Sequence, residues 1–143
     1  MPYRFLEEHA ISDVAFEAWG DTIEEMLQSA ARALTNTMTE DVDKIERKIT
    51  KEFDVEAANV EMLVFNFLQE LIFFKDAERL LFSKFDLDVN EKEGRWHLSV
   101  KSYGEELSPE KHDLRADVKA VSFHNYRVEK TPGRWEADVI LDV

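Results

Sequence analysis

The stretch that decides the fold runs from residue 13 to residue 38 and reads DVAFEAWGDTIEEMLQSAARALTNTM. Its first part alternates apolar and polar side chains, which predicts a short β-strand that ends at Gly20. Residues 22–25, TIEE, then match a capping box, in which a hydroxyl and a carboxylate satisfy reciprocal backbone donors at a helix start. Apolar residues follow at helical spacing as far as Met38, so this helix is expected to bury one stripe.

The segments that follow show the same two periodicities. They are, in chain order, a strand at residues 45–55, a helix at residues 60–77, a hairpin of residues 85–89 and 96–100, a strand at residues 114–128, and a last strand at residues 135–141. Charged residues among the apolar ones make the first of these segments an edge strand. The order strand, helix, strand, helix, hairpin, hairpin predicts one α+β domain over residues 1–143, with a mixed β-sheet and two helices packed on one face.

The composition places the chain among globular proteins of ordinary size. It has 143 residues, of which 44% are hydrophobic and 34% are charged, enough for one domain with its own core. The absence of cysteine excludes disulfides and thiolate metal sites and favours a cytoplasmic location. The first residues carry no signal-peptide pattern and no apolar run approaches the length of a membrane span, so no membrane association is expected.

The charge balance is strongly acidic and bears on the partners. The chain has 18 Lys and Arg against 31 Asp and Glu, a formal net charge of −13. Nucleic-acid affinity depends on clustered basic residues that neutralise phosphates, and the basic residues here alternate with acids. Direct, tight binding of RNA or DNA is therefore disfavoured. A basic protein partner or a bound cation is favoured instead.

The last strand predicts a cation site. Its alternation requires one apolar face to be buried, which orders Asp142 and the free α-carboxylate of Val143 side by side. Hard divalent cations bind several anionic oxygens that are held together. Asp13 follows two glutamates and His9 near the N-terminus and would join this cluster if the two ends of the chain meet. The alternative is a solvated loop with a turn cap at residues 7–13, and the sequence leaves both open.

Lys119 and His124 lie in an apolar run that is expected to form a strand. A lone lysine in a strand is usually a snorkelling or edge residue, whereas beside an acidic cluster it could be an ion-pair member. His124 has no second histidine at zinc-ligand spacing, and His97 and His112 fall in a hairpin and a polar loop without an evident role. The chain has no nucleophile elbow, P-loop or dinucleotide fingerprint, so those enzyme classes get no support.

A set of short motifs carries a family resemblance. They are Glu8-His9 with Asp13-Val14, AWGDTIEE at residues 18–25, FLQEL at 67–71, YGE at 103–105 with KH at 111–112, KAVSFH at 119–124, and VILDV at 139–143. By these motifs the chain resembles, from end to end, the archease family, small acidic proteins that work with the RtcB-type RNA ligase of tRNA splicing and RNA repair. Each motif is weak alone, and their order and intervals make the set specific.

The resemblance implies which residues form the site. In archeases the aspartate of the N-terminal motif, the penultimate aspartate and the terminal residue form a cation site, which corresponds here to Asp13, Asp142 and Val143. The family's Lys-Ala-x-Thr-Tyr-His run falls on Lys119 to His124. The lysine of this run is implicated in activating the ligase, so Lys119 and His124 are the expected partner-activation residues.

The sequence departs from the family pattern at two places. The family usually reads Glu-His-Thr-Ala-Asp, whereas here three residues separate His9 from Asp13 and the threonine is absent. This spacing retains Asp13 as a ligand but puts a role for His9 in question. Ser122 and Phe123 stand where the family has threonine and tyrosine, which removes one aromatic hydroxyl.

The resemblance also implies a function, that of a protein cofactor rather than an enzyme. Archeases promote guanylylation of the ligase and its multiple turnover, and this chain is expected to do so through an acidic tip that binds a divalent cation. All-oxygen ligands favour calcium, with magnesium or manganese as alternatives. The competing functions are a chaperone that modulates a tRNA-modifying enzyme such as a tRNA methyltransferase, and a small metal-dependent hydrolase that uses the same carboxylates.

Overall fold

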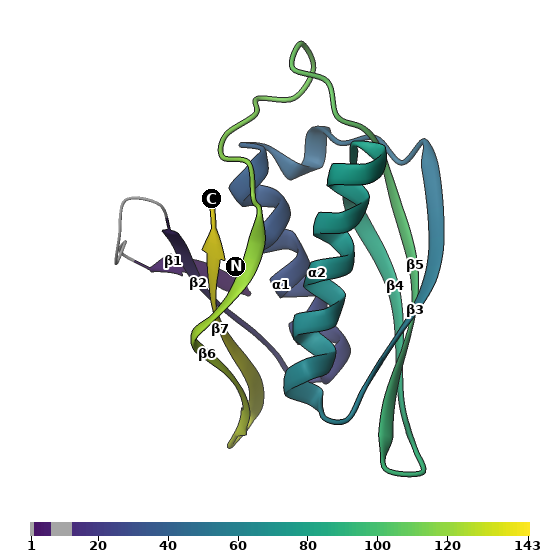
Figure 1. Ribbon diagram of the computed structural model, residues 1–143, viewed down its shortest axis with the longest axis vertical. Helices are drawn as coiled ribbons and strands as arrows, with labels where there is room; N and C mark the ends of the chain where they lie inside the picture. The colour runs from purple at the N-terminus through teal and green to yellow at the C-terminus, as the bar shows by residue number, and fades with distance from the viewer. Residues whose placement is uncertain (1, 7–12) are drawn as a thin grey trace.

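The protein has three layers, in which two helices lie between two antiparallel β-sheets (Figure 1). The structure, a computed structural model, describes residues 2–6 and 13–143. One sheet has the strand order β1-β2-β7-β6 and the other β3-β5-β4. The elements are β1 (Tyr3–Leu6), β2 (Asp13–Gly20), α1 (Ile23–Met38), the 3₁₀ helix η1 (Val42–Lys44), β3 (Ile49–Ala57), α2 (Val60–Glu78), β4 (Leu80–Lys92), β5 (Arg95–Glu106), β6 (Ala120–Thr131) and β7 (Arg134–Asp142). Each helix contacts both sheets, so one core fills the space between them.

The α+β class with two helices packed against the β-structure is confirmed. The strands, however, form two sheets where one was expected. The sequence predicts a single mixed sheet, whereas the described strands form two sheets whose pairs are all antiparallel. The reason is that neither helix connects two neighbouring strands: α1 joins β2 and β3, which belong to different sheets, and α2 joins β3 and β4, which have β5 between them. The predicted edge position of β3 is confirmed. β1 was not predicted, because four residues are too few for a clear alternation.

The junction between β2 and α1 forms at the predicted place, with the hydroxyl half of the capping box, whereas the carboxylate of Glu25 accepts from the hydroxyl of Thr22 instead of a backbone N–H. The hydroxyl of Thr22 accepts a hydrogen bond of 3.1 Å from the backbone N–H of Glu25 and so caps α1. Gly20 ends β2 against the first turn of the helix, where an added Cβ would lie 2.5 Å from both Cβ of Glu25 and the backbone nitrogen of Met26. Only glycine permits this close approach of strand and helix.

The second helix is capped at both ends and supplies much of the core. The side-chain oxygen of Asn59 accepts a hydrogen bond of 2.8 Å from the backbone N–H of Met62, and Arg79 ends the helix in the left-handed conformation with φ 57°. Its fully or nearly buried residues are Leu63, Val64, Phe67, Leu68, Leu71 and Ile72. Within residues 2–6 and 13–143, no helix has both the length and the apolar character that crossing a membrane requires.

The segment before β6 is not a strand, although the sequence predicts one from residue 114. Leu114 makes an isolated bridge to Thr39, and the strand begins only at Ala120. The backbone N–H of Arg115 instead donates a 2.8 Å hydrogen bond to the carbonyl oxygen of Met38 at the end of α1. The last carbonyls of a helix lack partners within it, so this segment is used to satisfy them rather than to extend the sheet.

Candidate cation and partner site at the strand tip

Three strand ends meet at one end of the four-stranded sheet. Asp13 opens β2 and lies directly opposite Asp142, the last residue of β7, in the antiparallel register. On the other side of β7, Ala120 at the start of β6 pairs with the same aspartate. The backbone N–H of Lys119 donates a 2.8 Å hydrogen bond to the carbonyl oxygen of Asp142. We call Asp13, Lys119, Asp142 and Val143 the strand tip; Figure 1 shows the C-terminal end of β7 beside the start of β6.

The two aspartates of the strand tip are placed so that they repel each other. Directly opposed residues of an antiparallel pair carry their side chains on the same face, with Cβ atoms about 4.5–5.5 Å apart, and like charges in such a pair are destabilising. Asp142 is exposed and Asp13 is half-buried, so both carboxylates reach solvent. A cation between them would replace this repulsion with attraction.

The donor set at the strand tip suits a hard cation but is small. Within the described residues, no group of three or more His, Cys, Asp or Glu side chains is arranged to hold a metal ion. A cation held by Asp13 and Asp142 would therefore need further oxygens from the backbone, from the α-carboxylate of a chain that ends at Val143, or from water. With that set of oxygens, calcium, magnesium and manganese fit better than zinc or copper. The cation site stays a prediction.

Burial of its neighbours keeps the strand tip ordered. Leu141 is fully buried and Ile140 is nearly so, and the side chain of Val143 packs against the core. Alternation along β7 turns Asp142 to the face opposite Leu141 and Val143. The acidic residue is thus held out to solvent by a strand that cannot move without exposing apolar surface.

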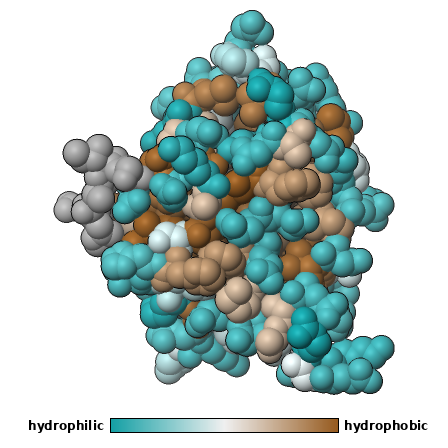
Figure 2. Space-filling view, in the orientation of Figure 1, coloured by the Kyte–Doolittle hydropathy of each residue, from teal (hydrophilic) through white to brown (hydrophobic). Residues whose placement is uncertain are grey.

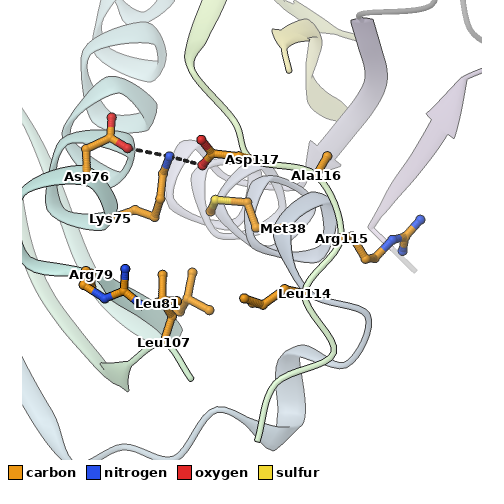
Figure 3. A pocket seen from close by; sticks show the side chains of 10 residues that line it. All are labelled: Met38, Lys75, Asp76, Arg79, Leu81, Leu107, Leu114, Arg115, Ala116 and Asp117. Atoms are coloured by element: carbon orange, nitrogen blue, oxygen red, sulfur yellow. Dashed lines mark hydrogen bonds and ion pairs between the residues drawn. The ribbon is translucent and has the colours of Figure 1, made fainter. Parts of the chain in front are cut away.

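Lys119 is exposed, and the residues before it are anchored by a buried lysine of α2 (Figure 3). The ammonium nitrogen of Lys75, whose side chain is 6% exposed, lies 2.5 Å from a carboxylate oxygen of Asp117 and 2.7 Å from the carbonyl oxygen of Val118. It also forms an ion pair with Asp76 at 2.6 Å. Burial alone would lower the pKa of Lys75, but the hydrogen bonds to Asp117 and Asp76 outweigh it, so the pKa is raised above its ordinary value.

A second side chain of α2 fixes the residues after Lys119. The side-chain oxygen of Gln69 accepts a 2.8 Å hydrogen bond from the backbone N–H of Val121. Lys75 and Gln69 therefore hold the start of β6 on both sides of Lys119. Neither role is predicted from the sequence, although Lys75 gives one signal, since it is a single lysine at the end of an apolar helical run.

A buried ion network anchors the other end of the segment that leads to β6. Glu105 of β5 accepts hydrogen bonds of 2.7 Å from the backbone N–H of Glu46 and 2.9 Å from the ammonium of Lys111. Nε2 of His112 lies 3.1 Å from the same carboxylate, and its Nδ1 accepts from the backbone N–H of Ser108, which assigns the proton to Nε2. Burial alone would raise the pKa of Glu105, but these hydrogen bonds outweigh burial, so the pKa is lowered from 4.5 to about 2.

This network corrects one expectation about a histidine and leaves another untested. His112, which the sequence places in a polar loop without a role, is 1% exposed and holds that loop in place. His124 is exposed and lies in an irregular part of β6, beyond the level at which Ala120 pairs with Asp142, so the structure does not place it in the strand tip. Glu7, Glu8 and His9 lie outside the described residues.

Comparison with known proteins decides the family. The model of the Archease protein family (MTH1598/TM1083) matches residues 3–143. The chain belongs to the archease family. Protein archease of Pyrococcus furiosus is 37% identical to it over 137 residues, which is 95% of each chain, and that of Methanopyrus kandleri is 35% identical over 143 residues, which is 100% of each.

Solved structures agree with the archease fold. Protein 1598 of Methanobacterium thermoautotrophicum has a solution structure that matches this chain with a TM-score of 0.86 and 34% identity, over 99% of both chains. A crystal structure from Thermotoga maritima, described as an archease and possible chaperone, matches with a TM-score of 0.61 and 15% identity, over 96% of both chains. The second likeness bears on the fold alone.

Several motifs that carry the family resemblance have a physical role in this archease. Gly20 lies at the strand–helix junction, and Gln69 holds β6. Glu105 and His112 form the buried network at the start of the segment that leads to the strand tip. These residues therefore support the place where Asp13, Lys119 and Asp142 meet.

Proposed function

We propose that this archease activates an RtcB-type RNA ligase in the cytoplasm, promoting guanylylation and multiple turnover in tRNA splicing and RNA repair. The observation that carries the proposal is the strand tip, in which Asp13 and Asp142 are directly opposed and the backbone of Lys119 is bonded to Asp142. Family membership supports the same function, because three of the residues implied by the resemblance, Asp13, Lys119 and Asp142, meet at the strand tip.

The proposed mechanism is electrostatic. The acidic strand tip enters the positively charged active site of the ligase and supplies or positions a divalent cation there. The cation aligns the triphosphate for attack by the ligase histidine, a task of positioning and charge neutralisation rather than of covalent chemistry on the archease. Lys119 adds an exposed positive charge at the same end of the sheet and can bind a phosphate oxygen. The archease itself is a protein cofactor and not an enzyme.

The decisive experiment is ligase guanylylation under single- and multiple-turnover conditions. Asp13→Asn, Asp142→Asn and Lys119→Met should each abolish most of the stimulation. Asp54→Asn is the matched control, because Asp54 is exposed on β3 of the other sheet. Full stimulation by the strand-tip variants, or no stimulation by the wild type, would refute the proposed function.

The proposed cation is calcium, with magnesium or manganese as alternatives, bound by Asp13, Asp142 and Val143. Calorimetric titration with each ion tests it on the isolated protein. Asp142→Asn should abolish binding, and one glycine added after Val143, which moves the α-carboxylate, should weaken it. Unchanged affinity in both variants would place the cation elsewhere.

A second candidate is a chaperone that modulates a tRNA-modifying enzyme such as a tRNA methyltransferase. The observation that favours it is the net charge of −13, which suits a basic RNA enzyme as partner. The chaperone function is tested by measuring whether the protein suppresses aggregation of a tRNA methyltransferase. A chaperone function would survive the strand-tip substitutions, whereas ligase activation would not.

A further inference from the structure

Strand β6 contains a large bulge that changes what it presents to solvent. Ser122 pairs with Ile140 and the next pair along the strands is Arg127 with Asp138, so residues 123–126 stand opposite a single residue of β7. Asn125 in this bulge has φ 54°, a left-handed conformation that asparagine tolerates. Bulges of this kind redirect side chains and are common at functional sites.

The bulge places an aromatic ring on the outside of α2. Phe123 stacks on Phe65 with ring centroids 4.1 Å apart and planes 7° from parallel. Tyr126 meets Phe65 edge-on at 5.6 Å, and its hydroxyl donates a 2.7 Å hydrogen bond to the carbonyl oxygen of Glu61. Phe123 nevertheless remains 63% exposed, because only one face of its ring is covered. Core burial therefore does not explain the bulge.

The same side of α2 exposes further apolar groups. Met62, Phe65 and Phe73 recur at helical spacing on one face, and Phe73 is 55% exposed. In Figure 1 this helix lies in front, between β6 and β3, and Figure 2 shows apolar residues gathered at the middle of the same face. We call Met62, Phe65, Phe73, Phe123 and Tyr126 the aromatic face. Apolar side chains that gather on one exposed face in this way favour an interaction site.

The charges around the aromatic face define the kind of partner. Glu61 is exposed and Glu70 half-buried on α2, and neither has an ion-pair partner among residues 2–6 and 13–143. With a net charge of −13, such a surface repels phosphates and a second copy of the chain alike. Guanidinium groups stack on aromatic rings and bond to carboxylates, so arginine satisfies both features of the face.

We propose that the aromatic face docks an arginine-bearing basic segment of a partner protein. A guanidinium would stack on the uncovered side of Phe123, with Phe73 in apolar contact and Glu61 and Glu70 as the acceptors. The proposal rests on the proposed function in that the partner is the ligase that the strand tip engages. Phe123 lies on β6 four residues after Lys119, so the two surfaces belong to neighbouring parts of the chain. The strand tip then promotes guanylylation of the ligase, and the aromatic face stabilises the archease–ligase complex.

The test is the dissociation constant of the archease–ligase complex, measured by biolayer interferometry. Phe123→Ser and Phe73→Ser should each weaken binding about tenfold, and the double variant more, because exposed aromatics at the centre of an interface dominate affinity. Ile49→Ser is the matched control, since Ile49 is 37% exposed on β3 and lies outside the aromatic face. Glu70→Lys tests the charge without removing apolar contacts and should also weaken binding.

The outcomes separate this inference from the proposed function. Wild-type affinity in the double variant and in Glu70→Lys would overturn the docking surface alone, while stimulation by the wild type would leave the proposed function intact. No binding and no stimulation by the wild type would overturn the proposed function. Loss of a dimer in the double variant, seen by sedimentation, or loss of single-stranded RNA binding, would assign the face to another occupant and overturn the proposal.

Discussion

The repulsion between Asp13 and Asp142 makes a prediction about single residues. In the absence of divalent cations, Asp142→Asn should raise the free energy of unfolding by about 0.5 kcal/mol, because it removes a like-charge pair from directly opposed strand positions. In excess calcium the order should reverse, since only the wild type gains stability from a bound ion. Urea unfolding with and without calcium measures both. Equal calcium stabilisation of the two proteins would contradict the cation site.

Glu105 makes the fold sensitive to acid. Its pKa is lowered from 4.5 to about 2, so its contribution to stability is complete above the unfolded-state value and is lost as the pH falls from about 4.5 to 2. Glu105→Gln should lower the free energy of unfolding at pH 7 by about 2 kcal/mol, because it leaves donors of the buried network unpaired. The variant should also show less loss of stability between pH 4.5 and 2. Urea unfolding across this range is the measurement.

Lys75 links stability to the position of Lys119. Lys75→Met should cost about 2 kcal/mol, because the carbonyl of Val118 loses its partner and the ion pairs are lost. Since the pKa of Lys75 is raised, the wild-type contribution is complete below 10.5 and is lost as the pH rises through the raised value. Hydrogen exchange should quicken at Lys119 and Val121. Unchanged exchange there would show that Lys75 does not position the strand tip.

At the scale of elements, the junction of β2 with α1 leaves no room for an added side chain. Gly20→Ala should lower stability by about 3 kcal/mol, because the new Cβ would meet backbone atoms at 2.5 Å that cannot move separately. Gly94→Asn is the control: Gly94 has φ 78° with nothing within 4 Å of an added Cβ, and asparagine tolerates this conformation. Thermal unfolding compares the two. A similar loss in both would mean that the junction is not tightly packed.

The elements themselves were largely predictable, and their partners were not. Periodicity locates α1, α2 and β7, because a buried stripe or face repeats along each of them. It does not show that β2 and β3 belong to different sheets, since a strand has the same alternation of apolar and polar residues whichever strand it pairs with. Nor does it show that Arg115 and Ala116 satisfy the end of α1, because those hydrogen bonds use backbone groups that nearly every residue has.

The candidate site was predictable in its residues rather than in its geometry. Asp13, Lys119 and Asp142 stand out by type and by family resemblance, but only the strand register shows that they meet. The supports from Lys75 and Glu105 depend on burial among segments far apart in the chain, which no local pattern reports. The irregular pairing around Phe123 likewise arises from tertiary contact with α2.

At the scale of the whole molecule, the net charge of −13 predicts how association responds to salt. The association rate with a basic ligase should fall at least tenfold between about 0.05 and 0.5 M NaCl, because long-range attraction is screened. The dissociation rate should change less, since the aromatic face is apolar. Stopped-flow mixing at several salt concentrations separates the two rates. A salt-independent association rate would argue against charge-guided encounter.

The place of β7 in its sheet bears on how the protein is made. It follows β2 and β6 in the chain but lies between them, so neither strand has its central neighbour until β7 has left the ribosome. A nascent or prematurely released chain would expose two unpaired strand edges, which invite aggregation and proteolysis. It would also lack the pairing of Asp13 with Asp142. The strand tip therefore forms only after the last strand has been translated, and incomplete products would lack the site on which the proposed activation of a ligase rests.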